Sequence, residues 1–146
     1  FFFFSLCLLL LMSGISFVSI AKMEKNGIAE NPKYQLAVLL EERGLKNGFA
    51  SFWNAHAITV LSDSEITVRN IDIKEEGIIK AKYQTNKSWY ENDGETEEYF
   101  VLLTSEEIHT FQNTDEWDFF EAMAKDSYEI AEGYHIFTFD STFFLD

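Results

Sequence analysis

The chain is poor in cysteine, in proline and in basic residues. Cys7 is its single cysteine, so the chain can form neither an internal disulfide nor a zinc site built from several thiolates. Only 11 Lys and Arg residues stand against 25 Asp and Glu, which gives a formal net charge of -14 at pH 7. Nucleic acids and anionic lipid surfaces attract basic proteins, so this balance argues against both as partners.

Sequence motifs for known chemistry are also missing. The seven glycines are scattered, and neither GxGxxG nor GxxxxGK occurs. His56, His109 and His135 lie far apart, with no HExxH spacing for zinc and no GxSxG motif for a nucleophile. The acidic stretch 91–98 lacks the spacing of a calcium loop. We therefore expect no catalytic residue, no metal site and no cofactor in this chain.

The amino-terminal residues 1–21 carry no charge. At about 1.5 Å per residue they would form a helix of roughly 30 Å, the thickness of the hydrocarbon core of a bilayer. We expect a transmembrane helix at 1–21, a linker at 22–32 and one soluble domain at 33–146. A cleaved signal peptide is the alternative, although the apolar run is long for one and no basic residue precedes it. Because the chain opens inside this run, we expect it to belong to a longer protein.

The remaining sequence alternates between helical and extended patterns. Asn31-Pro32 predicts a helix that ends near Gly44, and two further helices are expected after Thr104 and Thr114. Residues 53–61 fit a helix or a strand equally well. The segments expected to form strands are 48–52, 65–73, 78–83, 99–103, 128–130 and 134–139. This order predicts an α/β sandwich with a mostly parallel sheet and a C-terminal antiparallel edge.

Aromatic residues supply the remaining candidates. The helix after Thr114 is predicted to turn five side chains inward: Trp117, Phe119, Phe120, Met123 and Ala124. Trp89 and Tyr90 resemble the stacking platforms that bind sugars or peptides, and core packing explains them equally well. With Trp53, they are the candidate binding residues.

One stretch resembles a known family. Residues 44–70, GLKNGFASFWNAHAITVLSDSEITVRN, resemble the C-terminal domain of bacterial multi-pass membrane glycosyltransferases similar to the dolichyl-phosphate-mannose protein mannosyltransferases. In that domain a leucine-rich helix and a glycine precede the pattern Tyr-Ala-x-Tyr-Trp-x-Ala and a Leu-Ser turn. The matching residues are Phe49, Ala50, Phe52, Trp53, Ala55, Leu61 and Ser62. At positions 49 and 52 this chain departs from the pattern, with phenylalanine in place of tyrosine. The later stretches 87–90 and 99–104 are also similar to that domain.

The resemblance implies a location and a role. Lys22 and Lys25 alone would favour a cytoplasmic domain, whereas the family places this domain on the extracytoplasmic side of the cell membrane. It also implies that residues 53–61 are helical and that the catalytic carboxylate lies in an early loop outside this chain.

The sequence therefore predicts one of two alternative functions. In the first, the chain is a non-catalytic C-terminal part of an enzyme that transfers a sugar from a polyprenyl-phosphate donor. Its partners would be the lipid bilayer, the lipid-linked sugar and a glycan or protein acceptor. The alternative is a single-span anchored protein that binds a sugar or a peptide and has no catalytic activity.

Overall fold

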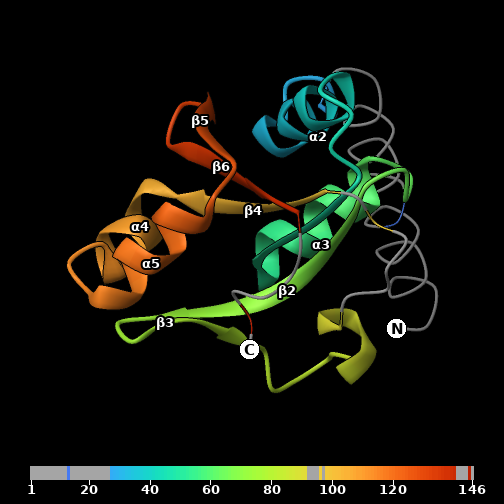
Figure 1. Cartoon of the computed structure of the whole chain (residues 1–146). Helices are drawn as coiled ribbons and strands as arrows, with labels where there is room; N and C mark the ends of the chain where they lie inside the picture. The colour runs from blue at the N-terminus through green and yellow to red at the C-terminus, as the bar shows by residue number, and fades with distance from the viewer. Residues whose placement is uncertain (1–12, 14–26, 92–95, 97, 141–144, 146) are drawn as a thin grey trace, which may run out of the picture.

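The computed structural model describes residues 13, 27–91, 96, 98–140 and 145, which form a six-stranded sheet with helices on both faces (Figure 1). The α-helices are α2 (Pro32–Glu42), α3 (Phe52–Leu61), α4 (Ser105–Phe111) and α5 (Asp115–Met123), and a short 3-10 helix, η1, spans Lys87–Tyr90. The strands are β1 (Asn47–Ser51), β2 (Thr67–Lys74), β3 (Gly77–Lys80), β4 (Tyr99–Thr104), β5 (Asp126–Ala131) and β6 (Tyr134–Phe139).

The expected transmembrane helix at 1–21 lies outside the described residues except for Ser13. Within the described part of the chain, no helix is both long and apolar enough to cross a bilayer.

The sheet is mixed, with the strand order β3-β2-β1-β4-β6-β5. β1 pairs in parallel with β2 and with β4, whereas the pairs β2–β3, β4–β6 and β5–β6 are antiparallel. The predicted antiparallel edge at the C-terminus is confirmed, but the prediction of a mostly parallel sheet is wrong. Only the turn at Glu75 and Glu76 separates β2 from β3, and parallel neighbours need a far longer crossover. The second edge of the sheet is therefore antiparallel as well.

Local sequence explains where the helices begin. Asn31 caps α2, because its side-chain oxygen accepts a hydrogen bond of 2.9 Å from the backbone N–H of Lys33. Thr104 and Glu107 form a reciprocal capping box at α4. Residues 52–61 form helix α3, which resolves the ambiguity left by the pattern of residues 53–61.

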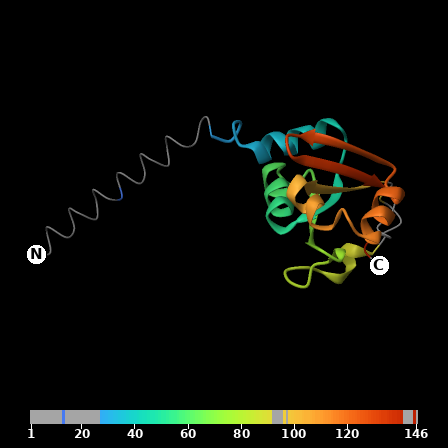
Figure 2. The ribbon, with the colours of Figure 1, turned by 90° about the vertical axis from the view of Figure 1, so that its left-hand side faces the viewer.

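The sheet separates two hydrophobic cores. The first core lies under α2 and α3 and includes Leu36, Leu40, Ala50, Ile58, Phe100 and Leu102. The second lies under α4, α5 and η1 and includes Phe49, Tyr90, Tyr99, Val101, Phe111, Phe120 and Phe137. Figure 2 shows the β5–β6 hairpin beside α2, so that hairpin helps to close the first core.

Helix α5 buries fewer side chains than the sequence predicts. Phe120 is buried, and Trp117 and Ala124 pack against the second core. Phe119 and Met123 are exposed to 57% and 46%, so the prediction that they point inward is wrong. At 100° per residue, positions 117, 120 and 124 share one narrow face of the helix, and 119 and 123 lie outside that face.

A close approach between the two central strands generates a stability prediction. Gly48 lies beside Phe100 in the β1–β4 pair, and a Cβ atom at Gly48 would overlap the Phe100 ring. Gly48→Ala is therefore expected to destabilise the fold by about 1–3 kcal/mol, measured by urea unfolding. Adding Phe100→Leu should recover part of that loss, so that the double variant loses less than the sum of the single ones. Strictly additive losses would contradict this explanation.

Candidate functional site

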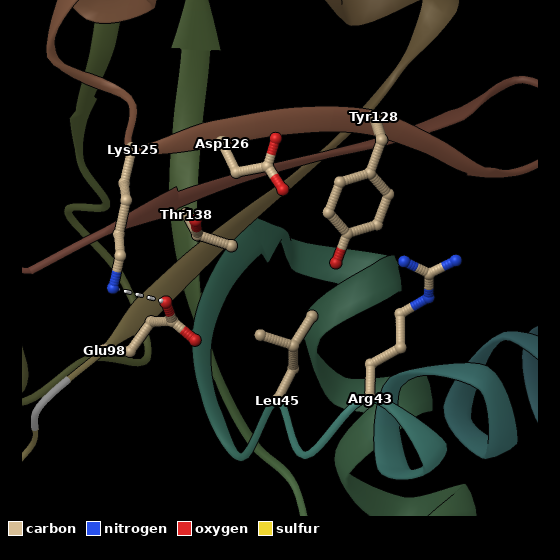
Figure 3. Close-up of a pocket in the computed structure, with 7 residues that line it drawn as sticks. All are labelled: Arg43, Leu45, Glu98, Lys125, Asp126, Tyr128 and Thr138. Atoms are coloured by element: carbon tan, nitrogen blue, oxygen red, sulfur yellow. Dashed lines mark hydrogen bonds and ion pairs between the residues drawn. The ribbon is translucent and has the colours of Figure 1, made fainter.

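A pocket of about 320 Å³ lies at one end of the sheet, where the amino ends of β1, β4 and β5 meet the carboxyl end of β6 (Figure 3). These ends coincide because β1, β4 and β5 run in one direction and β6 runs in the other. The lining residues are Arg43, Leu45, Glu98, Lys125, Asp126, Tyr128 and Thr138. The volume is at the lower limit for small-molecule sites, which span about 300–1,000 Å³.

The β5–β6 hairpin supplies one wall of the pocket. Asp126 lies directly opposite Thr138 in the ladder, and Tyr128 follows two residues later, so all three side chains project from one face. Thr138 and Leu45 are buried and form the base. Figure 3 shows the Asp126 carboxylate and the Tyr128 hydroxyl pointing into the space above Leu45.

Cations stand on both flanks of the pocket. The Arg43 guanidinium lies 4.4 Å from the centroid of the Tyr128 ring, a cation–π contact. On the other flank, Lys125 Nζ lies 3.2 Å from a carboxylate oxygen of Glu98 and 3.2 Å from one of Asp140. The hydrogen bond to Glu98, followed by that to Asp140, raises the pKa of Lys125 above its ordinary value. These exposed pairs add little stability but hold the Lys125 ammonium at the rim.

Several polar groups of the pocket are available to a ligand. Among the described residues, neither the Arg43 guanidinium nor the Tyr128 hydroxyl forms a hydrogen bond. The Asp126 carboxylate accepts one hydrogen bond, from the backbone N–H of its neighbour Ser127. The pocket thus offers donors and an acceptor together, which suits a neutral polyol or a zwitterion better than a simple anion.

The three residues predicted to bind a ligand are not brought together. Trp53 is 78% exposed on α3, which covers one face of the sheet. Trp89 and Tyr90 pack into the second core on the other face. Of the three rings, that of Trp53 is the one that is largely open to solvent.

Trp89 and Tyr90 make contacts that belong to the fold. The Trp89 carbonyl accepts a hydrogen bond of 2.6 Å from the Arg69 guanidinium. The Tyr90 hydroxyl donates one of 2.7 Å to the backbone oxygen of Asn70, and its ring stacks on Phe49 at 6.1 Å. Through this hydrogen bond and this ring contact, Tyr90 holds η1 against the sheet.

The structure also joins two residues that no sequence motif connects. The Ser105 hydroxyl lies 3.1 Å from Nε2 of His135, thirty residues further along the chain. Glu129 stands opposite His135 in the β5–β6 ladder, and its carboxylate accepts the Gly133 N–H at 2.9 Å. Ser105 is exposed and its own N–H donates to the Gly133 carbonyl. We interpret these hydrogen bonds as structural, because they connect the start of α4 to the β5–β6 turn.

The described part of the chain contains no group of three or more His, Cys, Asp or Glu side chains that could hold a metal ion.

Comparison with known proteins adds no relative. The chain matches no known protein family, no curated protein and no solved structure. A functional proposal therefore rests on the pattern of residues 44–70 and on the geometry described above.

The buried phenol of Tyr90 generates a prediction about pH. Burial raises the pKa of Tyr90 above its ordinary value of 10.0. The unfolded chain then loses this proton first, so the free energy of unfolding should fall as the pH rises through and above 10. Tyr90→Phe should lose about 1 kcal/mol at neutral pH, because the hydrogen bond to Asn70 is gone, and should lack this part of the alkaline decline. Urea unfolding of both proteins at neutral and alkaline pH measures the difference. An identical decline in the two would contradict the prediction.

Proposed function

We propose that the chain is the last membrane span and the C-terminal extracytoplasmic domain of an integral membrane glycosyltransferase, which transfers a sugar from a polyprenyl-phosphate donor. The observation that carries the proposal is the stretch 44–70, which resembles that domain over the β1–α3–β2 unit. The domain is non-catalytic and helps to arrange the acceptor beside the membrane-embedded active site. The catalytic carboxylate belongs to another part of the enzyme.

The matching residues support this proposal by dividing into two groups. Phe49, Ala50 and Ala55 are fully buried, and Ser62 closes the turn after α3 by accepting the Ile66 N–H at 3.2 Å. These residues therefore contribute to the stability of the fold. Trp53 is 78% exposed and contributes little to the core. A large aromatic residue that the fold does not need, in a stretch that resembles a family, is typical of a contact with another component.

The amino-terminal residues support the proposed membrane span, whereas the extracytoplasmic side rests on the family resemblance. Their uncharged run is long enough to cross a bilayer, and residues 22–31 connect it to α2. The proposed partners are the bilayer, the polyprenyl-phosphate-linked sugar and a glycan or protein acceptor, the last two through the longer enzyme.

The proposal predicts a functional role for Trp53 in the complete enzyme. Trp53→Ala should lower sugar transfer in a membrane assay and change the free energy of unfolding by less than about 0.5 kcal/mol, because the side chain is exposed. Phe119→Ala is the matched control, since Phe119 is exposed on the opposite side of the sheet.

One result would overturn the proposal, and a second would remove one part of it. The gene upstream of residue 1 should encode many further hydrophobic spans, and an initiator Met a few codons before residue 1 would rule out the longer enzyme. Unchanged transfer by Trp53→Ala would remove the role of the exposed ring.

A second candidate is a single-span anchored protein that binds a sugar or a peptide. The pocket is the observation that favours it, because hydrogen-bonding groups of both kinds surround one space of about 320 Å³. On this reading the ligand occupies the pocket and not the packed rings of Trp89 and Tyr90.

This candidate predicts that Arg43 contributes to ligand binding. Saturation-transfer NMR of the full chain with a panel of monosaccharides should detect binding. Arg43→Ala should weaken it by about tenfold or more, because a charged hydrogen bond contributes about 1.5–3 kcal/mol. Lys80→Ala, at an exposed lysine on β3, is the charge-matched control. If no sugar binds, or if both variants bind equally, the pocket is not a sugar site.

A further inference from the structure

Helix α3 has an unusual composition for a surface helix of this chain. Its ten residues, Phe52–Leu61, include no Asp, Glu, Lys or Arg, although the chain has 25 acidic and 11 basic residues. The inner side of α3 is accounted for, because Asn54, Ala55 and Ile58 are buried against the sheet. The apolar composition of the outer side of α3 still needs an explanation.

The outer side of α3 is largely apolar and exposed. Trp53 and Val60 are exposed to 78% and 75%, and His56 between them is exposed as well. Positions 53, 56, 57 and 60 share one side of a helix, and we call these residues the outer α3 stripe. A surface helix normally turns a polar face to water, and a helix that is apolar all round is normally covered. The stripe therefore has the composition of a covered surface.

Aromatic contacts give the stripe a defined shape. The Phe52 ring meets the Trp53 ring edge to face at a centroid distance of 5.2 Å and the His56 ring at 4.5 Å. Such packing restricts the rotamers of these side chains before any partner arrives, so less conformational entropy is lost on docking.

The stripe lies next to the point where the amino-terminal segment joins the domain. Lys33, in the first turn of α2, donates a hydrogen bond of 3.4 Å from its Nζ to the backbone oxygen of Trp53. Ten residues, 22–31, separate the uncharged run from α2 and reach at most about 36 Å when fully extended. If residues 1–21 span a bilayer, the stripe is held within reach of its surface.

We propose that the outer α3 stripe docks on the bilayer interface, with the Trp53 and His56 rings at the level of the lipid headgroups and Val60 beside them. This inference rests on the proposed membrane span. Indole rings favour that interface, where one end of the ring system is apolar and the other is hydrated. The stripe itself has no carboxylate, whereas the domain around it is strongly acidic. Zwitterionic lipid is therefore the surface it fits, since anionic lipid would repel the rest of the domain.

Spin labels on the full chain test this docking. Cys7→Ser removes the native thiol, and Val60→Cys then places a nitroxide on the stripe, at a side chain exposed enough to tolerate it. Phe119→Cys is the matched control on α5, which covers the opposite face of the sheet. Both proteins are inserted singly into phosphatidylcholine nanodiscs, and collisions with oxygen and with a water-soluble nickel chelate are measured.

Docking predicts that the label at position 60 collides more with oxygen and less with nickel than the label at 119. Adding Trp53→Ser should reduce that difference, and anionic lipid should reduce it too.

Equal accessibility at the two positions, in a chain retained by the nanodisc, would overturn the docking and leave the span and the glycosyltransferase proposal intact. A chain that does not stay with the nanodisc would overturn the docking together with the span. Protection at 60 that is equally strong without lipid would show a protein partner and would also overturn it.

Discussion

The parallel pairing of β1 with β4 at the centre of the sheet is the constraint on which the rest of the structure depends. Two parallel neighbours cannot be joined by a tight turn, so the chain must cross over between them. It leaves β1 through α3 on one face and leaves β4 through α4 and α5 on the other. Each face of the sheet is thereby covered, and β4 is buried along nearly its whole length. Gly48 allows the closest part of this pairing, since it makes room for the ring of Phe100.

The helix that directly follows β1 is also the one with an apolar outer side. β1 passes directly into α3, so the aromatic residues at this junction have to accommodate both a strand end and a helix start. Phe52 is half-buried, and its ring contacts the rings of both Trp53 and His56. The acidic residues of the chain are distributed over other elements, including the first turns of α4 and α5. Helix α3 thus carries no charged residue, whereas acidic residues begin both α4 and α5.

Sequence patterns predicted the elements better than their arrangement. Strong local signals such as the Asn31 cap and the Thr104 capping box placed helices where the structure has them, because both act within a few residues. The direction of β3 was missed, since strand direction depends on the length of the connection, and here that connection is two residues. Phe119 is apolar, yet its angular position on this short helix turns it to solvent, and apolar composition alone does not predict that.

The candidate sites were also hard to predict from sequence, because the contacts that define them join residues far apart in the chain. Trp89 and Tyr90 are consecutive aromatics, and only the position of Asn70 and Phe49 on neighbouring strands decides that Tyr90 belongs to the core. The pocket joins residues from the α2–β1 connection, β5 and its approach, β6 and the approach to β4, so no window of sequence contains it. Trp53 matches the pattern of the family resemblance, but its exposure depends on how α3 packs against the sheet.

Both borders of the sheet are built in a way that discourages aggregation. An unpaired border strand presents free N–H and C=O groups that can recruit a strand from another molecule. Here β3 is four residues long and ends at the exposed Lys80, while β5 is broken by an irregularity between Glu129 and Ala131 and carries exposed acidic side chains. Short, charged and irregular borders are poor templates for cross-molecular β-pairing. If residues 1–21 span a bilayer as proposed, copies in one membrane would meet far more often than copies in solution, and such borders would let them crowd together without polymerising.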